Sequence, residues 1–154
     1  MSDTRAAALA QHPFLAELGE EALARFAQAT EEREYPAGSF IFREGEEADR
    51  LYLIQKGRVA LELNVPGRGA TQLESLRPGD ILGLSWLFPP YRWHLDARAV
   101  EAVTILAVDA EELRTCLVEE PALCSELAMR LLHQLYQRLE RVRMQRLDLY
   151  KAGA

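Results

Sequence analysis

The segment from Pro36 to Leu61 constrains the fold of this chain more than any other. Its apolar residues recur at every second position in short runs, and glycines separate the runs. Such alternation is typical of β-strands with one buried face, and glycine turns join antiparallel neighbours. Only glycine adopts a positive φ at little cost, so tight turns are expected at these glycines. The segment predicts short antiparallel strands in a compact roll. The glycines are Gly38, Gly45 and Gly57.

Helical patterns flank the predicted strands on both sides. Residues 1–30 form a helical lead-in that Pro13 interrupts, and residues 110–151 form C-terminal helices. Asp109 is suited to cap the first of these, and Pro121 suits the first turn of the second. Residues 31–109 supply the strands. We therefore expect one α+β domain over residues 1–154: an antiparallel, jelly-roll-like double-stranded β-roll with N-terminal helices and a long C-terminal dimerisation helix.

Composition narrows the classes of function. The formal net charge of −6 argues against binding of nucleic acid by this chain alone. No apolar run approaches the roughly 18 residues that a membrane span needs, and the N-terminus lacks the apolar core of a signal peptide. We therefore expect a cytoplasmic protein without membrane contact. Cys116 and Cys124 form no CxxC pair, which predicts free thiols and no metal site.

The last predicted helix runs from Pro121 to about Tyr150 without an internal Gly or Pro. Its apolar residues recur at spacings of three and four, which is typical of a coiled-coil seam. Roughly 30 helical residues span about 45 Å, more than a roll of this size covers. We therefore expect a homodimer through this helix; the alternative is packing of the stripe on the chain's own sheet. The stripe consists of Leu132, Leu135, Leu139, Val142 and Leu149.

The order of the turn and strand residues resembles the cyclic-nucleotide-binding domain family. The matching positions are Pro36-x-Gly38, Gly45, Ala48, Leu51-Tyr52 and Gly57. The resemblance extends from His12-Pro13-Phe14 into the C-terminal helix, in the order found in the sensor half of catabolite-activator-type bacterial regulators. It implies a regulatory role in signal transduction, with a cyclic nucleotide as ligand. It also implies a helix-turn-helix after the long helix, whereas this chain stops at residue 154, either as a stand-alone sensor or as a cut one.

The resemblance weakens where the family holds its ligand. There a cassette follows a Pro-Gly-Asp turn; amides at the start of a short helix and an Arg hold the phosphate, and a Glu accepts from the ribose. Gly83 matches, but Leu84 stands at the Glu position and Trp93 at the Arg position. Arg92 is one residue away, and a different loop length would let it replace the Arg.

The resemblance also implies other ligand-facing positions. The first part of the segment from Leu82 to Ala99 is expected to form one short helix, closed by Pro89-Pro90. An ungapped alignment from Arg98 places Arg138 and Leu139 where the family's C-terminal helix meets the purine. The candidate ligand-binding residues are Gly83, Leu84, Ser85, Arg92, Trp93, His94 and Arg138.

Three interpretations of the aromatic segment 84–93 remain open. Its rings fill the former cavity, or they line a modified pocket for a nucleotide or another anion, or they form a patch for a partner protein. We expect a regulatory sensor that binds cyclic AMP and cyclic GMP weakly or not at all. The alternatives are a protein-interaction module and the sensor half of a transcription regulator.

No pattern indicates an enzyme, a resident cofactor or a metal centre. Ser85 lacks the second glycine of a nucleophile elbow, and no catalytic triad accompanies it. The three histidines are far apart and are expected to be surface or packing residues. Arginines outnumber acids on the last helix and are expected to form its solvated face. They are Arg130, Arg138, Arg141, Arg143 and Arg146.

Overall fold

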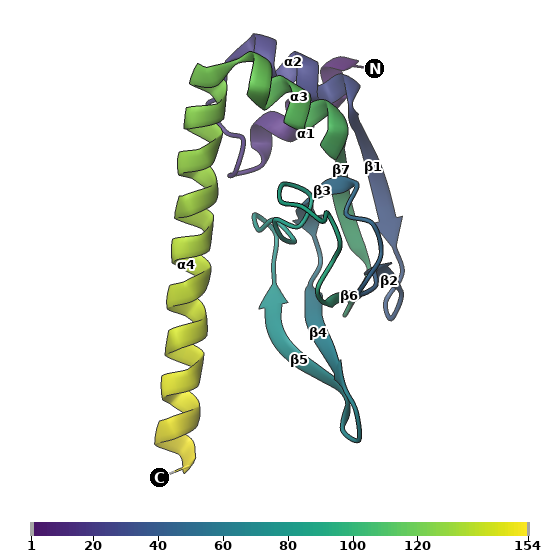
Figure 1. Ribbon diagram of the computed structural model, residues 1–154, viewed down its shortest axis with the longest axis vertical. Coiled ribbons are helices and arrows are strands. Elements are labelled where there is room, and N and C mark those ends of the chain that lie inside the picture. The colour runs from purple at the N-terminus through teal and green to yellow at the C-terminus, as the bar shows by residue number, and fades with distance from the viewer. Residues whose placement is uncertain (1, 154) are drawn as a thin grey trace.

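The computed structural model describes the backbone of residues 2–153 and the side chains of residues 4–148. In the described part of the chain, two helices precede seven strands, and two helices follow them (Figure 1). The elements are α1 (Ser2–Gln11), α2 (Glu20–Gln28), β1 (Thr30–Tyr35), β2 (Phe40–Phe42), β3 (Arg50–Lys56), β4 (Val59–Val65), β5 (Gly69–Leu76), β6 (Asp96–Ala99), β7 (Val103–Asp109), α3 (Ala110–Glu119) and α4 (Pro121–Gly153).

The strands form two antiparallel sheets, which we call the roll. One sheet has the order β1-β7-β3, and the other has the order β2-β6-β4-β5. Gly38, Gly45 and Gly57 adopt φ values of 87°, 88° and 87° at the turns between strands, as expected. The predicted α+β roll with flanking helices is confirmed.

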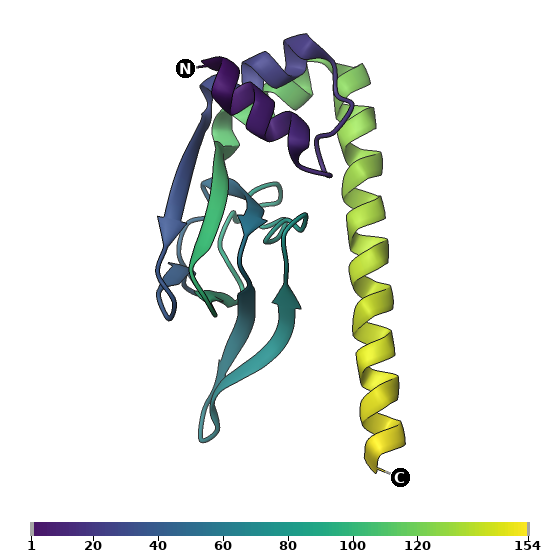
Figure 2. The same cartoon turned by 180° about the vertical axis from the view of Figure 1, so that it is seen from behind.

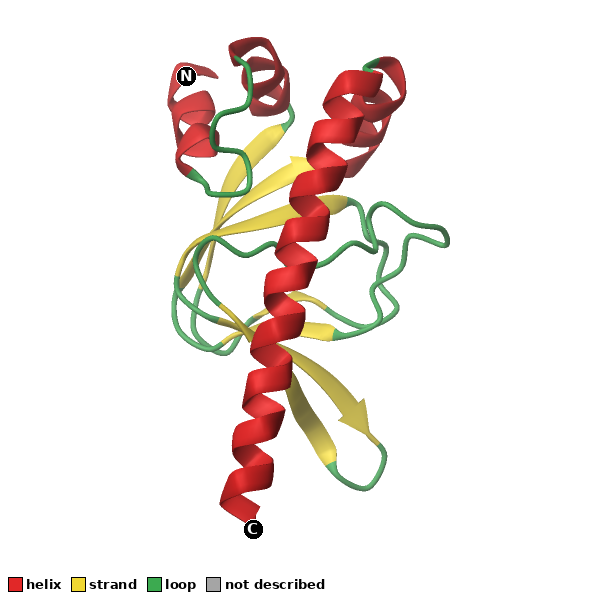
Figure 3. Cartoon of the chain, turned by 90° about the vertical axis from the view of Figure 1, so that its left-hand side faces the viewer, coloured by secondary structure: helices red, strands yellow, loops and turns green. Residues whose placement is uncertain are grey.

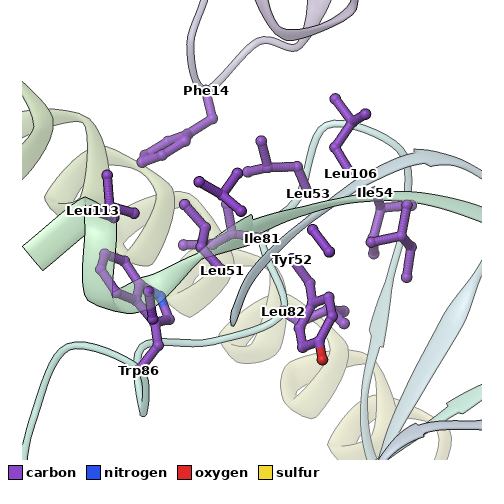
Figure 4. Close-up of a cluster of buried hydrophobic side chains, with 14 of the residues drawn as sticks. Phe14, Leu51, Tyr52, Leu53, Ile54, Ile81, Leu82, Trp86, Leu106 and Leu113 are labelled. Carbon is purple, nitrogen blue, oxygen red and sulfur yellow. The ribbon is translucent and has the colours of Figure 1, made fainter. Parts of the chain in front are cut away.

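Helices α1, α2 and α3 cover one end of the roll, where β1 and β7 reach them (Figure 2). The amphipathic α2 buries Leu23, Phe26 and Ala27. Beneath the helices, Phe14, Trp86 and Leu113 gather at one side of a large apolar cluster (Figure 4). The same core therefore joins the helical end, the sheets and the segment that carries Trp86.

Helix α4 leaves the helical end and runs the length of the molecule beside the roll (Figures 1 and 3). The Asp109 carboxylate accepts from the Glu112 amide and caps α3, and Pro121 is the first residue of α4, as predicted. The stripe residues with described side chains are exposed: Leu132 by 59%, Leu135 by 39%, Leu139 by 46% and Val142 by 36%. The stripe therefore does not pack on the chain's own sheet. The side chain of Leu149 lies outside the described residues.

None of the helices in the described part of the chain combines the length and the apolar character needed to cross a lipid bilayer.

Candidate functional site

The candidate site is the segment between β5 and β6. Its first part forms turns over residues 84–90 rather than the expected short helix. The Leu87 amide donates to the Leu84 carbonyl at 2.9 Å, and the Tyr91 amide donates to the Phe88 carbonyl at 3.0 Å. The expectation of a helix was wrong: Pro89 and Pro90 leave only residues 84–88 for it, and a residue before proline disfavours the helical conformation, so only single turns close. The segment therefore lacks a helix N-terminus of the kind that gathers several amides on one anion.

The second part of the segment pairs with the turn region before β3. The Trp93 amide donates to the Glu46 carbonyl at 3.0 Å, and the Gly45 amide donates to the Trp93 carbonyl at 2.8 Å. In such an extended segment, successive side chains point to opposite faces. Trp93 accordingly points inward and is 4% exposed, whereas Arg92 and His94 are exposed. The Arg92 guanidinium instead donates to the Gly45 carbonyl at 3.4 Å.

Trp93 lies in an aromatic cluster inside the roll. Its ring stacks on Phe42 with centroids 3.8 Å apart and planes 5° from parallel, and Tyr52 lies 6.0 Å away. The absence of a side chain at Gly83 leaves room for the Trp93 ring, since a Cβ on Gly83 would come 3.3 Å from that ring. Burial also raises the pKa of Tyr52 to about 12, so its hydroxyl stays neutral.

Two of these residues lack the groups that the resemblance implies for holding a ligand. Leu84 and Ser85 are half-buried, and Leu84 has no atom that accepts a bond from a sugar hydroxyl. Trp93 carries no charge to balance a phosphate. Among the described residues, no buried side-chain nitrogen or oxygen lacks a hydrogen-bond partner. Apolar and aromatic contacts, rather than unpaired polar groups, therefore characterise the interior around Trp93.

Trp86 fastens the same segment to the helical end. It is 1% exposed, and its indole N–H donates to the Gly83 carbonyl at 2.9 Å. From α3, Arg114 donates to the Trp86 carbonyl and lies 4.3 Å from the centre of the Tyr91 ring. Sequence reasoning missed Arg114, because nothing in the local pattern of α3 shows that its arginine meets an aromatic loop 28 residues away.

The arginines of α4 depart from the solvated face predicted for them. Arg138 pairs with Glu74 of β5, and Arg141 pairs with Asp80. Arg130 donates to the Phe14 carbonyl at 2.9 Å, so three of the five arginines bind other parts of the chain. Arg143 and Arg146 are exposed, as predicted. The recurrence of polar residues at 130, 134, 138 and 141, together with acids in the strands, is the signal that could have revealed this contact.

The remaining candidates have structural surroundings. His94 and His133 are exposed, and His12 is buried. The His12 Nδ1 accepts from the Phe14 amide at 3.2 Å, so its proton lies on Nε2, which donates to the Ile54 carbonyl at 3.1 Å. Burial lowers the pKa of His12 to about 4. Burial also raises the pKa of the Cys116 thiol to about 11. The described residues contain no cluster of three or more metal-ligating side chains.

Comparison with known proteins agrees with this architecture. The family model of the cyclic nucleotide-binding domain matches residues 32–120, which is more than half of the chain. A CRP-like cAMP-activated global transcriptional regulator of Mycobacterium tuberculosis is 29% identical over 128 residues, which cover 83% of this chain and 55% of the regulator. This chain thus spans about half the length of that curated relative.

Two solved structures extend the comparison. A protein from Geobacter metallireducens GS-15, described as a cyclic nucleotide-binding protein, aligns with a TM-score of 0.77 and 32% identity over 86% of this chain and 96% of that one. The regulatory subunit of a cAMP-independent protein kinase A from Trypanosoma cruzi, bound to guanosine, aligns with a TM-score of 0.65 and 26% identity over 75% of this chain and 42% of that one. With its roll, its turn glycines and its flanking helices, this chain belongs to the cyclic nucleotide-binding domain family.

Proposed function

We propose that this chain is a regulatory sensor domain whose degenerate cassette binds cyclic AMP and cyclic GMP weakly or not at all. The observation that carries the proposal is the buried stack of Trp93 on Phe42, at the position where the family resemblance implies a phosphate-binding Arg. Leu84 at the position of the ribose acceptor adds to it. An aromatic cluster of this kind is stabilised by the burial of its rings.

The expected loss of affinity follows from the missing contacts. A ribose hydroxyl left unpaired against Leu84 costs about 1–3 kcal/mol. Losing a charge-assisted bond to phosphate costs more, because such bonds are roughly twice as strong as neutral ones. Together these losses predict affinity about a hundredfold or more below that of a complete cassette, at about 1.4 kcal/mol for each factor of ten.

Isothermal titration with cyclic AMP and with cyclic GMP tests this prediction. We expect little or no heat at micromolar nucleotide for the wild-type chain. The double variant Leu84→Glu, Trp93→Arg restores the two missing side chains and should bind more tightly than the wild type. The same titrations are carried out on Arg92→Ala. Low-micromolar binding by the wild type that disappears in Arg92→Ala would show a displaced but working pocket and overturn the proposal.

A second candidate function is a protein-interaction module that uses the segment 84–93. One observation favours it: Phe88 is 59% exposed within this segment, and Pro89 and Pro90 after it are exposed too. Exposed aromatic residues on a constrained loop are common anchors of protein interfaces. Loss of partner binding in Phe88→Ala, with unchanged nucleotide titration, would favour this function over a sensor.

A third candidate is the sensor half of a transcription regulator. Its support is the similarity to the mycobacterial regulator, of which this chain covers 55%. Binding of the isolated chain to DNA, sensitive to salt and sequence, would contradict our expectation that this chain alone does not bind nucleic acid. Our proposal includes a cytoplasmic location and no catalytic role.

We also propose that the chain forms a homodimer through α4. The exposed stripe of Leu132, Leu135, Leu139 and Val142 supports this, because it continues along a face of α4 that the roll leaves uncovered. Leu149 belongs to the same proposal by its place in the sequence.

A further inference from the structure

The side chains through which α4 meets the rest of the chain are apolar near its start and polar farther along. Near its start, Leu127 and Leu131 are 4% and 7% exposed and pack in the apolar core. Leu131 is the last buried residue among the described side chains of α4. Farther along, three polar side chains hydrogen-bond to the roll and to the turn that follows β5. They are Gln134, Arg138 and Arg141, which we call the polar latch.

Arg138 makes the most complete of these contacts. Its Nε and Nη2 donate to the two carboxylate oxygens of Glu74 at 2.8 and 2.9 Å, and its Nη1 donates to the Ile81 carbonyl at 3.1 Å. The side chains of Arg138 and Glu74 are 11% and 20% exposed. A planar fork held on three sides constrains direction as well as distance. The contact therefore limits rotation of α4 as well as separation from β5.

The other two members of the latch reach the Pro-Gly-Asp turn. The Gln134 amide group donates to the Gly79 carbonyl at 2.9 Å, and Arg141 donates to Asp80 Oδ2 at 2.9 Å. The same Asp80 oxygen accepts from the Arg77 amide at 3.0 Å, which closes the turn. Helix α4 is thus joined to the turn from which the chain enters the segment around Trp93.

The latch and the apolar stripe occupy different faces of α4. At 3.6 residues per turn, the three latch residues lie within about 60° of one another, and the centre of the stripe lies about 100° around the helix. We infer that the polar latch sets the rotation of α4 against the roll without any bound ligand. It thereby determines the direction in which the stripe points. Any effect of this direction on how a partner copy is oriented rests on the proposed homodimer, whereas the latch itself does not.

Glu74 has a particular role in this arrangement. By resemblance, Arg138 stands where the family's C-terminal helix meets a purine, yet here all three of its nitrogens bind groups of the chain itself. Glu74 supplies from within the protein an anion that occupies Arg138. A ligand that approached Arg138 would have to displace this carboxylate first.

Hydrogen–deuterium exchange of the backbone amides of residues 134–142 tests the latch. A helix released from its support is marginal in water and frays. We expect Arg138→Ala and Glu74→Gln each to speed exchange in this segment by about tenfold, which corresponds to about 1.4 kcal/mol. Glu74→Gln keeps the size of the side chain in β5, so it remains informative if Arg138→Ala folds poorly.

The matched control is Arg143→Ala. Arg143 is also on α4, is exposed, and pairs with Glu140 of the same helix at 3.2 Å. Its exchange should stay within about twofold of the wild type. The exchanged pair Glu74→Arg, Arg138→Glu should restore part of the protection. Unchanged exchange in both latch variants, or an equal rise in Arg143→Ala, would overturn the inference.

A second set of measurements separates the latch from the dimer. The same variants are compared in a Leu135→Glu background, where the proposed stripe contact is broken. The latch predicts the same about tenfold difference there. If the wild-type chain proves monomeric but the latch variants still exchange faster, the homodimer fails and the latch stands. Loss of the difference in the Leu135→Glu background would show that dimer contacts, rather than the latch, protect α4.

Discussion

Trp93 and Arg92 are neighbours in the chain, yet their side chains lie on opposite faces of one extended segment. The difference arises because residues 91–93 pair with residues 45–48, and this pairing decides which side chain points inward. Slippage of the register by one residue would exchange the two. At this scale, the chemistry inside the roll depends on a register set by hydrogen bonds between segments about 45 residues apart.

The buried His12 predicts a pH dependence of stability. Its pKa is lowered to about 4 in the folded chain, from 6.5 in the unfolded one. The folded chain therefore keeps His12 neutral while the unfolded chain takes up a proton, so this contribution to stability is complete above pH 6.5 and is lost as the pH falls towards 4. Its full loss amounts to about 3 kcal/mol.

Urea unfolding at a series of pH values between 4 and 7 measures this contribution. His12→Gln keeps a donor towards the Ile54 carbonyl without titrating. Its stability should fall less steeply over the same pH range than that of the wild type. Parallel curves for the two proteins would assign the pH dependence to other groups.

The turn between β3 and β4 shows how closely one element can approach another. Gly57 has φ of 87°, and a Cβ on it would lie 2.4 Å from the Ala102 carbonyl oxygen. Gly38 has the same φ of 87°, but a Cβ there would meet nothing within 4 Å. The two glycines thus share a backbone conformation and differ in their surroundings.

Alanine at these two positions separates the cost of conformation from the cost of contact. Gly38→Ala should lower the free energy of unfolding by about 1–2 kcal/mol, the cost of a left-handed conformation. Gly57→Ala should lower it by about 2 kcal/mol more, because the methyl group overlaps a backbone atom. Thermal or urea denaturation measures both. Equal losses would mean that the β3–β4 turn and the Ala102 region move apart easily.

At the scale of the whole molecule, two faces of α4 have different surroundings. One face is joined to the roll by the latch, and another presents an exposed apolar stripe over Leu132, Leu135, Leu139 and Val142. A stripe of this kind on a helix longer than its support favours association with a second copy.

Leu135→Glu tests that association. A charge placed in a desolvated seam costs about 3 kcal/mol or more, which weakens self-association by about a hundredfold or more. Sedimentation velocity or light scattering at micromolar concentration gives the mass. Met144→Glu is the control, since Met144 is 56% exposed and lies on the opposite side of α4 from the stripe. A wild-type chain that is already monomeric, or equal effects of both variants, would contradict the proposal.

Much of the fold could be predicted from local pattern. The alternation before Leu61 and the glycines at the turns indicated the roll, and Asp109 and Pro121 marked the starts of the last two helices, because strand period, positive φ and helix caps are local properties of the chain. The lack of a hydrogen-bond acceptor at Leu84, where the family has a Glu, could also be predicted, since a leucine side chain has no hydrogen-bonding atom in any conformation.

Only the tertiary structure decided the rest. Whether Trp93 or Arg92 points inward depends on pairing with a distant turn, and whether Arg138 is solvated depends on Glu74, which comes from a strand 64 residues earlier. Arg114 likewise meets Trp86 and Tyr91 through the packing of α3 against a segment distant in sequence. A local pattern gives the period of a segment and the chemistry of its residues, whereas a partner distant in sequence is selected by the packing of the whole chain.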